Sequence, residues 1–312
     1  MSVPVVDKSP SQWASGVLFA VLCSVGLGLA VAFGRLAFDG GTTPLTVGLC
    51  RAAFSVLVMG MLCRLAGISL RLPRGFLLQM LFAGVLFSHM AFGNVGATKY
   101  IPVSLAALLF FVYPPLVALL NGAVDRRRPG AVKMVAMLTA FAGLAVMLGV
   151  DLDQLDLRGV ALGLTSGLAC AINIVWVSRR ARGLHPFQIV FYQSCVATVV
   201  LGVLTVRFDA FAWPGIESGW WALGLVVALQ SASIPLYYFS IQRIGTEPAA
   251  MLNNLQPVAS IVAAIVLFQE LLTTETLAGA AMVLGGILLM QWSDSRGGNR
   301  HGRDIDSRSR LP

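Results

Sequence analysis

Long apolar stretches, separated by short polar connections, follow one another along almost the whole chain. Ten of them have the roughly 17–25 residues that a helix needs to cross a hydrocarbon core of about 30 Å. Their approximate limits are 12–36, 44–65, 75–97, 102–123, 131–150, 158–178, 186–206, 219–241, 247–269 and 275–292. The pattern therefore predicts an all-α integral membrane protein with ten transmembrane helices and no hidden soluble domain.

The chain matches itself at an offset of about 143 residues, which divides it into two halves. The matching pairs include Gly16 with Gly159, Pro44 with Pro186 after one deletion, Pro114 with Pro257, and Gly143 with Gly286. We expect an N-terminal tail (1–11), a first five-helix repeat (12–150), a second five-helix repeat (151–292) and a basic tail (293–312). Five crossings per half make the second half enter from the opposite face, so the repeats are inverted, an arrangement that suits alternating access.

Composition and charge agree with a membrane protein and predict its orientation. Hydrophobic residues make up 57% of the chain and charged residues 12%, and the mean hydropathy is +0.81. Of the 22 Lys and Arg, only Arg35, Lys99, Arg158 and Arg207 fall on one side, Arg51 lies inside a helix, and the others gather on the opposite side. By the positive-inside rule both termini are cytoplasmic, in the inner (plasma) membrane. The first stretch is too long for a signal peptide and lacks a cleavage site, so we interpret it as a helix.

Amides and a proline interrupt the ninth apolar stretch, "AAMLNNLQPVASIVAAIVLFQE". Asn253, Gln256 and Ser260 share one helical face there, and Pro257 leaves a backbone carbonyl without its helical partner. Polar groups at membrane depth need partners or water, so this face is expected to point inward. The eighth stretch repeats the idea with Gln230, Ser233 and Tyr237. We predict that these two stripes line a substrate path.

Further polar or titratable residues lie inside other apolar stretches and complete the predicted substrate-binding set. They are Arg51, His89, Tyr113, Tyr192 and Gln193, of which Gln193 occupies the repeat position of Arg51. Arg51 is predicted to recognise an anionic group of the substrate, although a guanidinium near a helix end also has the alternative of reaching the interface. For isolated amides such as Asn121 and Asn173, hydrogen bonds that join helices are the alternative role. Pro114 and Pro257 are expected to shape the backbone.

Enzyme classes find little support in the sequence. It contains no GxxxxGK[ST], HExxH or GxSxG motif and no paired intramembrane aspartates. The five cysteines show no CxxC spacing and are interpreted as packing residues. The basic residues sit at helix ends without a nucleic-acid-binding motif, so no nucleic-acid partner is expected. We expect no enzyme activity, cofactor or metal, and the partners we expect are a small-molecule substrate and the lipid bilayer, with the oligomeric state left open.

The stretch "IGTEPAAMLNNLQPVASIVAAIVLFQELLTTETLAGAAMVLGGILLM" resembles the second-repeat signature of EamA-type transporters of the drug/metabolite transporter superfamily. In that signature a proline lies mid-helix and a glutamate closes the helix, here Pro257 and Glu270. The first repeat carries Arg127 at the position that corresponds to Glu270. The resemblance implies a secondary carrier for small metabolites, often an exporter of amino acids or related amphipathic compounds.

Together these observations predict a secondary transporter of a small polar or amphipathic metabolite that works by alternating access, and the resemblance implies that it is an exporter. A membrane sensor or scaffold subunit that binds without translocating is the alternative. Accumulation in reconstituted vesicles distinguishes the two, because a binder saturates without accumulating its ligand.

Overall fold

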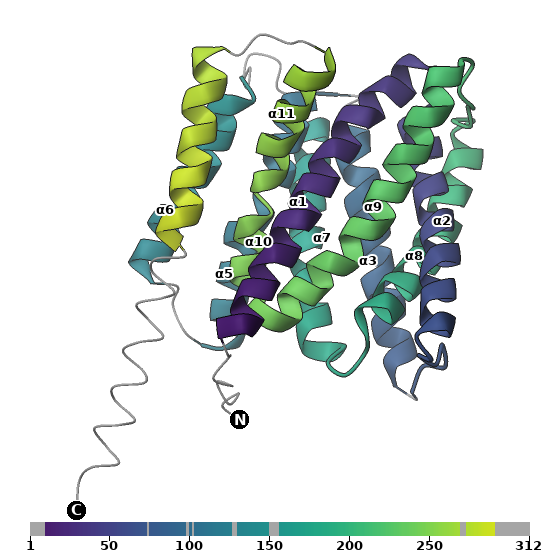
Figure 1. Cartoon of the computed structure of the whole chain (residues 1–312), viewed down its shortest axis with the longest axis horizontal. Coiled ribbons are helices and arrows are strands. Elements are labelled where there is room, and N and C mark those ends of the chain that lie inside the picture. Colours follow the sequence, from purple (N-terminus) through teal and green to yellow (C-terminus); the bar gives the residue numbers. More distant parts are fainter. Residues whose placement is uncertain are drawn as a thin grey trace, which may run out of the picture.

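The computed structural model describes residues 10–73, 75–97, 100–101, 103–126, 130–149, 156–268 and 273–290. Within these ranges the regular secondary structure is entirely helical, as the all-α prediction requires. The helices are α1 (Pro10–Asp39), α2 (Pro44–Leu65), α3 (Phe76–Ala97), α4 (Val103–Phe110), α5 (Tyr113–Val124), α6 (Ala131–Met147), α7 (Leu157–Arg180), α8 (Pro186–Arg207), α9 (Glu217–Ile244), α10 (Thr246–Leu252) and α11 (Leu255–Phe268). A further apolar helix, Thr274–Met290, follows α11 (Figure 1).

Eight helical segments of the described chain are long and apolar enough to cross a membrane, and two shorter apolar helices, Ala131–Met147 and Thr274–Met290, accompany them. The outward faces carry large apolar side chains, with Leu57, Leu78 and Val266 each more than 70% exposed. Polar side chains such as Ser55, Asn173 and Gln193 are instead buried inside the bundle. This reversal of the soluble pattern places lipid against the outer surface, and the prediction of a multi-pass membrane protein is confirmed.

Two of the expected transmembrane helices are each divided in two. The stretch 102–123 was expected to be continuous but breaks at residues 111–112 between α4 and α5, and the stretch 247–269 breaks at residues 253–254 between α10 and α11. Pro257 has no N–H to give the carbonyl of Asn253, four residues earlier, and that carbonyl accepts from the Gln256 N–H at 3.0 Å instead. The two prolines, Pro114 and Pro257, thus indicated where a helix is interrupted. Each of them lies in the first turn of the second helix, α5 or α11, and the first helix ends before it.

Close helix pairs are made possible by glycines at several contacts. A Cβ atom on Gly279 would lie 2.4 Å from the carbonyl oxygen of Gly143, so α6 and the helix Thr274–Met290 approach backbone to backbone. These two helices stand together at the left edge of the bundle in Figure 1, the latter in yellow. On the other side α1 lies along α9, α3 along α7 and α2 along α8.

Several contacts recur at positions about 143 residues apart. Gly16 of α1 packs against Ile244, and Gly159 of α7 packs against Ile101. Pro44 and Pro186 each begin a helix of 22 residues. In α2, Thr46 Oγ1 donates to the carbonyl of Ala210, which follows α8, at 3.1 Å. In α8, Gln188 Nε2 donates to the carbonyl of Ser69, which follows α2, at 2.6 Å. Each helix of the α2–α8 pair thus bonds the connection that follows the other.

Candidate functional site

A buried polar cluster lies where the two broken helices meet α1. The Asn253 side chain, at the break between α10 and α11, donates from Nδ2 to the Tyr113 hydroxyl at 2.8 Å, at the start of α5. Its Oδ1 accepts from the Ser24 hydroxyl of α1 at 3.2 Å, and its Nδ2 lies 3.5 Å from Gln256 Oε1. Tyr113 and Asn253 are 1% and 7% exposed. The structure therefore joins both helix breaks through one amide inside the bundle, and we call Ser24, Tyr113, Asn253 and Gln256 the break cluster.

Aromatic rings and one hydroxyl without a partner surround the break cluster. Phe110 and Phe111 place their ring centroids 5.5 and 6.1 Å from that of Tyr113. The hydroxyl of Tyr237 on α9 is inaccessible to solvent and has no hydrogen-bond partner in the described part of the chain. A buried hydroxyl without a partner costs free energy, so it is a group that a bound polar ligand would stabilise.

A second polar contact joins α2 to α9. Arg51 donates from Nη1 to Gln230 Oε1 at 2.6 Å. One turn further along α2, the hydroxyl of Ser55 lies 2.7 Å from that of Ser231, the residue after Gln230 on α9. Within the described part of the chain, the Arg51 guanidinium donates to the amide oxygen of Gln230. A guanidinium has five N–H donors and a full positive charge. A neutral amide does not compensate that charge, so the guanidinium retains the capacity to bind an anion.

The polar residues of α7, α8 and α9 form a closed ring. Tyr238 donates to Gln193 Oε1 at 2.8 Å, Gln193 Nε2 donates to Asn173 Oδ1 at 2.9 Å, and Asn173 Nδ2 donates to the Tyr238 hydroxyl at 3.3 Å. All three side chains are buried. Because each member is satisfied by the other two, the ring holds three helices together and fixes the position of Tyr238.

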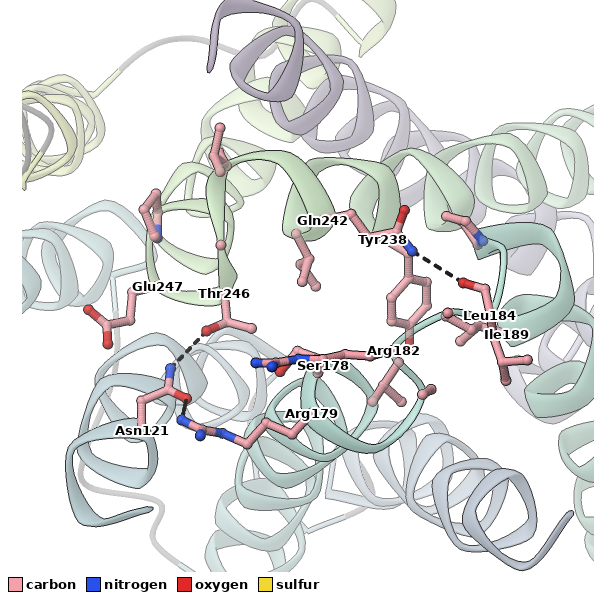
Figure 2. A pocket seen from close by; sticks show the side chains of 18 of the residues that line it. Asn121, Ser178, Arg179, Arg182, Leu184, Ile189, Tyr238, Gln242, Thr246 and Glu247 are labelled. Carbon is pink, nitrogen blue, oxygen red and sulfur yellow. Dashed lines mark hydrogen bonds between the residues drawn. The ribbon is translucent and has the colours of Figure 1, made fainter. Parts of the chain in front are cut away.

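A pocket of about 1000 Å³ opens at the end of the bundle where α1 begins (Figure 2). Its walls come from the ends of α5, α7 and α9 and the starts of α8 and α10, and Tyr238 of the buried ring is one of the lining residues. The charged lining residues are Asp125, Lys133, Arg179, Arg182 and Glu247, joined by neutral Asn121, Ser178, Gln242 and Thr246. The pocket thus offers both signs of charge, which suits a small polar ligand that carries both.

Hydrogen bonds and ion pairs cross the wall of this pocket. Arg179 holds both carboxylate oxygens of Asp125, at 2.8 and 2.9 Å, and donates to Asn121 Oδ1 at 2.9 Å. Asn121 donates in turn to Thr246 Oγ1 at 2.7 Å, as Figure 2 shows. Lys133 lies 3.0 Å from Glu247. These contacts connect α5, α6, α7 and α10 at one end of the bundle.

His185 is a titratable pocket residue outside the helices. It forms the N-cap of α8, where its ring Nδ1 accepts from the backbone N–H of Phe187 at 3.3 Å. The backbone N–H of His185 donates to Gln188 Oε1 at 2.9 Å. Its ring packs against Phe187 and Phe239, with centroids 4.7 and 5.3 Å away. Burial lowers the pKa of His185 below its ordinary value, so the neutral ring that can accept the cap hydrogen bond is favoured.

The remaining predicted site residues do not join these clusters. Tyr192 donates to the carbonyl of Leu70 in the connection between α2 and α3, and Ser233 donates to Leu229 within its own helix at 2.7 Å, facing Gly26 of α1. His89 is half-buried on α3. Glu270 lies outside the described residues. The sequence thus indicated polar positions correctly but did not separate those that gather from those that bond locally.

Sequence reasoning missed several of the residues that the structure brings together. Ser24 looked like an ordinary small residue of an apolar helix, and Tyr238 followed the predicted Tyr237 by one position. Arg179 was interpreted as an orientation charge at a helix end. A signal existed for Arg179, since Asp125 and Asn121 lie on one helix face four residues apart, but their pairing depends on a contact across 54 residues of chain.

Known proteins share both the sequence and the fold of this chain. The sequence profile of the EamA-like transporter family matches residues 157–292. The threonine/homoserine exporter RhtA of Escherichia coli K12 is 30% identical over 226 residues, which cover 70% of this chain and 71% of RhtA. The chain belongs to the EamA-like transporter family. An uncharacterized transporter of Archaeoglobus fulgidus is 28% identical over 62% of this chain and 69% of its own length.

A solved crystal structure supports the same architecture at lower identity. It superposes with a TM-score of 0.73 over 90% of this chain and 97% of its own, with 20% sequence identity. That similarity concerns the fold alone. The family membership confirms the resemblance drawn from residues 244–290, and the chain is a transporter of the drug/metabolite transporter superfamily.

Proposed function

We propose that this protein is a secondary transporter that exports a small polar or amphipathic metabolite, such as an amino acid or a related compound, by alternating access. The observation that carries the proposal is the break cluster, in which two interrupted helices meet over hydrogen-bonding side chains inside an apolar bundle. Irregular backbone at membrane depth is tolerated where it lines a cavity or is buried in protein, and carriers use such breaks to bind substrate. The similarity to RhtA, a threonine/homoserine exporter, supports this substrate class and direction.

Ten crossings in two inverted repeats are part of the proposal. The recurring contacts support it, because Gly16 against Ile244 and Gly159 against Ile101 bring the start of one half to the middle of the other. The reciprocal bonds of Thr46 and Gln188 lie at opposite ends of the α2–α8 pair, as a two-fold axis in the membrane plane requires. Under the positive-inside rule both termini are cytoplasmic, so the pocket of Figure 2 opens toward the cytoplasm.

Substrate contacts are proposed at two depths. At the break cluster Asn253, Gln256 and Tyr113 supply neutral donors and acceptors, and the Tyr237 hydroxyl supplies one more. Toward the opposite end, Arg51 with its neutral partner Gln230 is proposed to bind a carboxylate or another anionic group. A buried guanidinium costs about 2.5 to 3.5 kcal/mol on insertion scales, and an anionic ligand offsets that cost.

Comparison of metabolites in cells with and without the protein tests this function. A secondary exporter lowers the intracellular level of its substrate and raises the extracellular level in proportion. A non-translocating sensor or scaffold, the alternative from the sequence, changes neither ratio directly. Unchanged ratios for all amino acids and related amphipathic compounds would contradict the proposal.

A further inference from the structure

The pocket at the α1 end contains an ion pair, Arg179 with Asp125, whose carboxylate a ligand carboxylate can replace. Arg179 binds Asp125 through two parallel hydrogen bonds, the geometry in which a guanidinium recognises any carboxylate. Asp125 is 46% exposed and Arg179 is 24% exposed. A pair so close to water contributes only about 0–1 kcal/mol, so a ligand carboxylate can replace Asp125 at little cost.

The same pair is connected to the break cluster through two short helices. Arg179 also bonds Asn121, and Asn121 bonds Thr246. Asn121 belongs to α5, which begins at Tyr113, and Thr246 begins α10, which ends beside Asn253. Eight residues of α-helix span about 12 Å, so a change at the pocket wall acts on segments that carry the break cluster at their other ends.

The Arg179 guanidinium also has an unused donor. Its Nε is buried and has no hydrogen-bond partner in the described part of the chain. Asp125 occupies the two terminal nitrogens and Asn121 shares one of them. The hydrogen bonds of the guanidinium to the protein are therefore incomplete.

We propose that Arg179 is a carboxylate-binding group at the pocket entrance, where the substrate carboxylate displaces Asp125. The freed Asp125 carboxylate then faces the ammonium group of the same zwitterionic substrate. Displacement also loosens the contacts among α5, α7 and α10, so that substrate binding and movement of the broken helices occur together. This inference rests on the proposed transport function and adds an entry site distinct from Arg51.

Exchange of the two side chains, Arg179 and Asp125, distinguishes a ligand-binding role of Arg179 from a purely structural ion pair. In Arg179→Asp/Asp125→Arg the ion pair can reform, but the guanidinium moves to α5. Arg179→Lys keeps the charge and loses the two-bond geometry. Arg180→Lys makes the same change at the next residue, which packs over the Trp176 ring and does not line the pocket, and it serves as the matched control.

Uptake into reconstituted vesicles is measured for L-threonine and for L-threonine amide, which keeps the ammonium group but lacks the carboxylate. We expect Arg179→Lys and the charge-exchanged variant to raise the KM for threonine about tenfold or more, the equivalent of about 1.4 kcal/mol. Transport of the amide is expected to change little in Arg179→Lys, and the control Arg180→Lys should not raise the KM for threonine. Wild-type kinetics in the charge-exchanged variant would overturn the inference and leave the pair a structural contact.

Thermal stabilisation of the detergent-purified protein by threonine gives a readout that does not depend on transport. We expect the wild type to gain melting temperature with threonine and Arg179→Lys to gain much less. If wild-type vesicles moved no substrate while this stabilisation persisted and depended on Arg179, the transport proposal would fail and the binding site would stand. Equal stabilisation of wild type and Arg179→Lys would overturn the site itself.

Discussion

Replacement of Asn253 by leucine tests the break cluster most severely. The side chain donates to Tyr113 at 2.8 Å, and its Oδ1 lies 3.2 Å from the Ser24 hydroxyl, whose single proton also has the carbonyls of Ala20 and Leu252 as acceptors. Hydrogen bonds between membrane helices contribute about 0.6 kcal/mol on average and about 1.7 at most, so the loss of the Tyr113 bond and of the shared Ser24 contact costs about 1 to 2 kcal/mol. Leucine favours the apolar surroundings, which offsets part of that cost. We therefore expect Asn253→Leu to insert and fold but to lose most transport, since the two helix breaks are no longer joined.

The neighbouring amide provides a matched control. Asn254 is equally buried at 7% exposure, but its Nδ2 meets only the Met251 sulfur at 3.5 Å and its Oδ1 has no partner among the described residues. Asn254→Leu should therefore keep transport and melting temperature close to wild type. The assays are substrate flux in reconstituted vesicles and thermal melting in detergent. Wild-type flux in Asn253→Leu, or equal losses in both variants, would refute the reasoning.

Three further predictions concern the charge, the topology and the helix cap. Arg51→Lys should insert normally yet raise the KM for an anionic or zwitterionic substrate about tenfold, because lysine lacks the planar fork, and wild-type kinetics would leave interfacial anchoring as the sufficient explanation. A periplasm-active reporter inserted at 151–158 should be active and one fused after Asp294 silent, and activity at the tail would contradict the orientation. His185→Ala should lower stability by about 1 kcal/mol at neutral pH through loss of the α8 cap. Because burial lowers the pKa of His185, this difference should be full above the ordinary value of 6.5 and should disappear as the pH falls through the lowered pKa. A difference that stays constant as the pH is lowered until the wild type unfolds would contradict it.

The sequence predicted the elements of this fold well because membrane helices carry their signal locally. Twenty apolar residues between polar connections are sufficient to indicate a crossing, and Pro257 indicates where a helix is interrupted. The pairing of polar groups is different in kind. Ser24 and Asn253 lie 229 positions apart, so periodicity could place Asn253 on an inward face but could not name its partner.

The candidate site was predictable only in part for the same reason. Gln193 and Gln230 both read as free amides in apolar helices, yet Gln193 is satisfied within a closed ring whereas Gln230 faces the charge of Arg51. That difference arises from which helices pack together, which no local pattern contains. Arg179 likewise fits a helix-end orientation charge until the structure brings it to Asp125.

Accumulation in vesicles reconstituted with the purified protein tests the central claim, translocation of a small zwitterion through this bundle, most directly. The measurement is counterflow, in which vesicles loaded with unlabelled L-threonine or another amino acid are diluted into a trace of the same labelled compound. A carrier that works by alternating access transiently accumulates the label above its equilibrium level, and Asn253→Leu abolishes that overshoot. Saturable binding without an overshoot, for every amino acid tested, would contradict the account and favour a membrane sensor or scaffold.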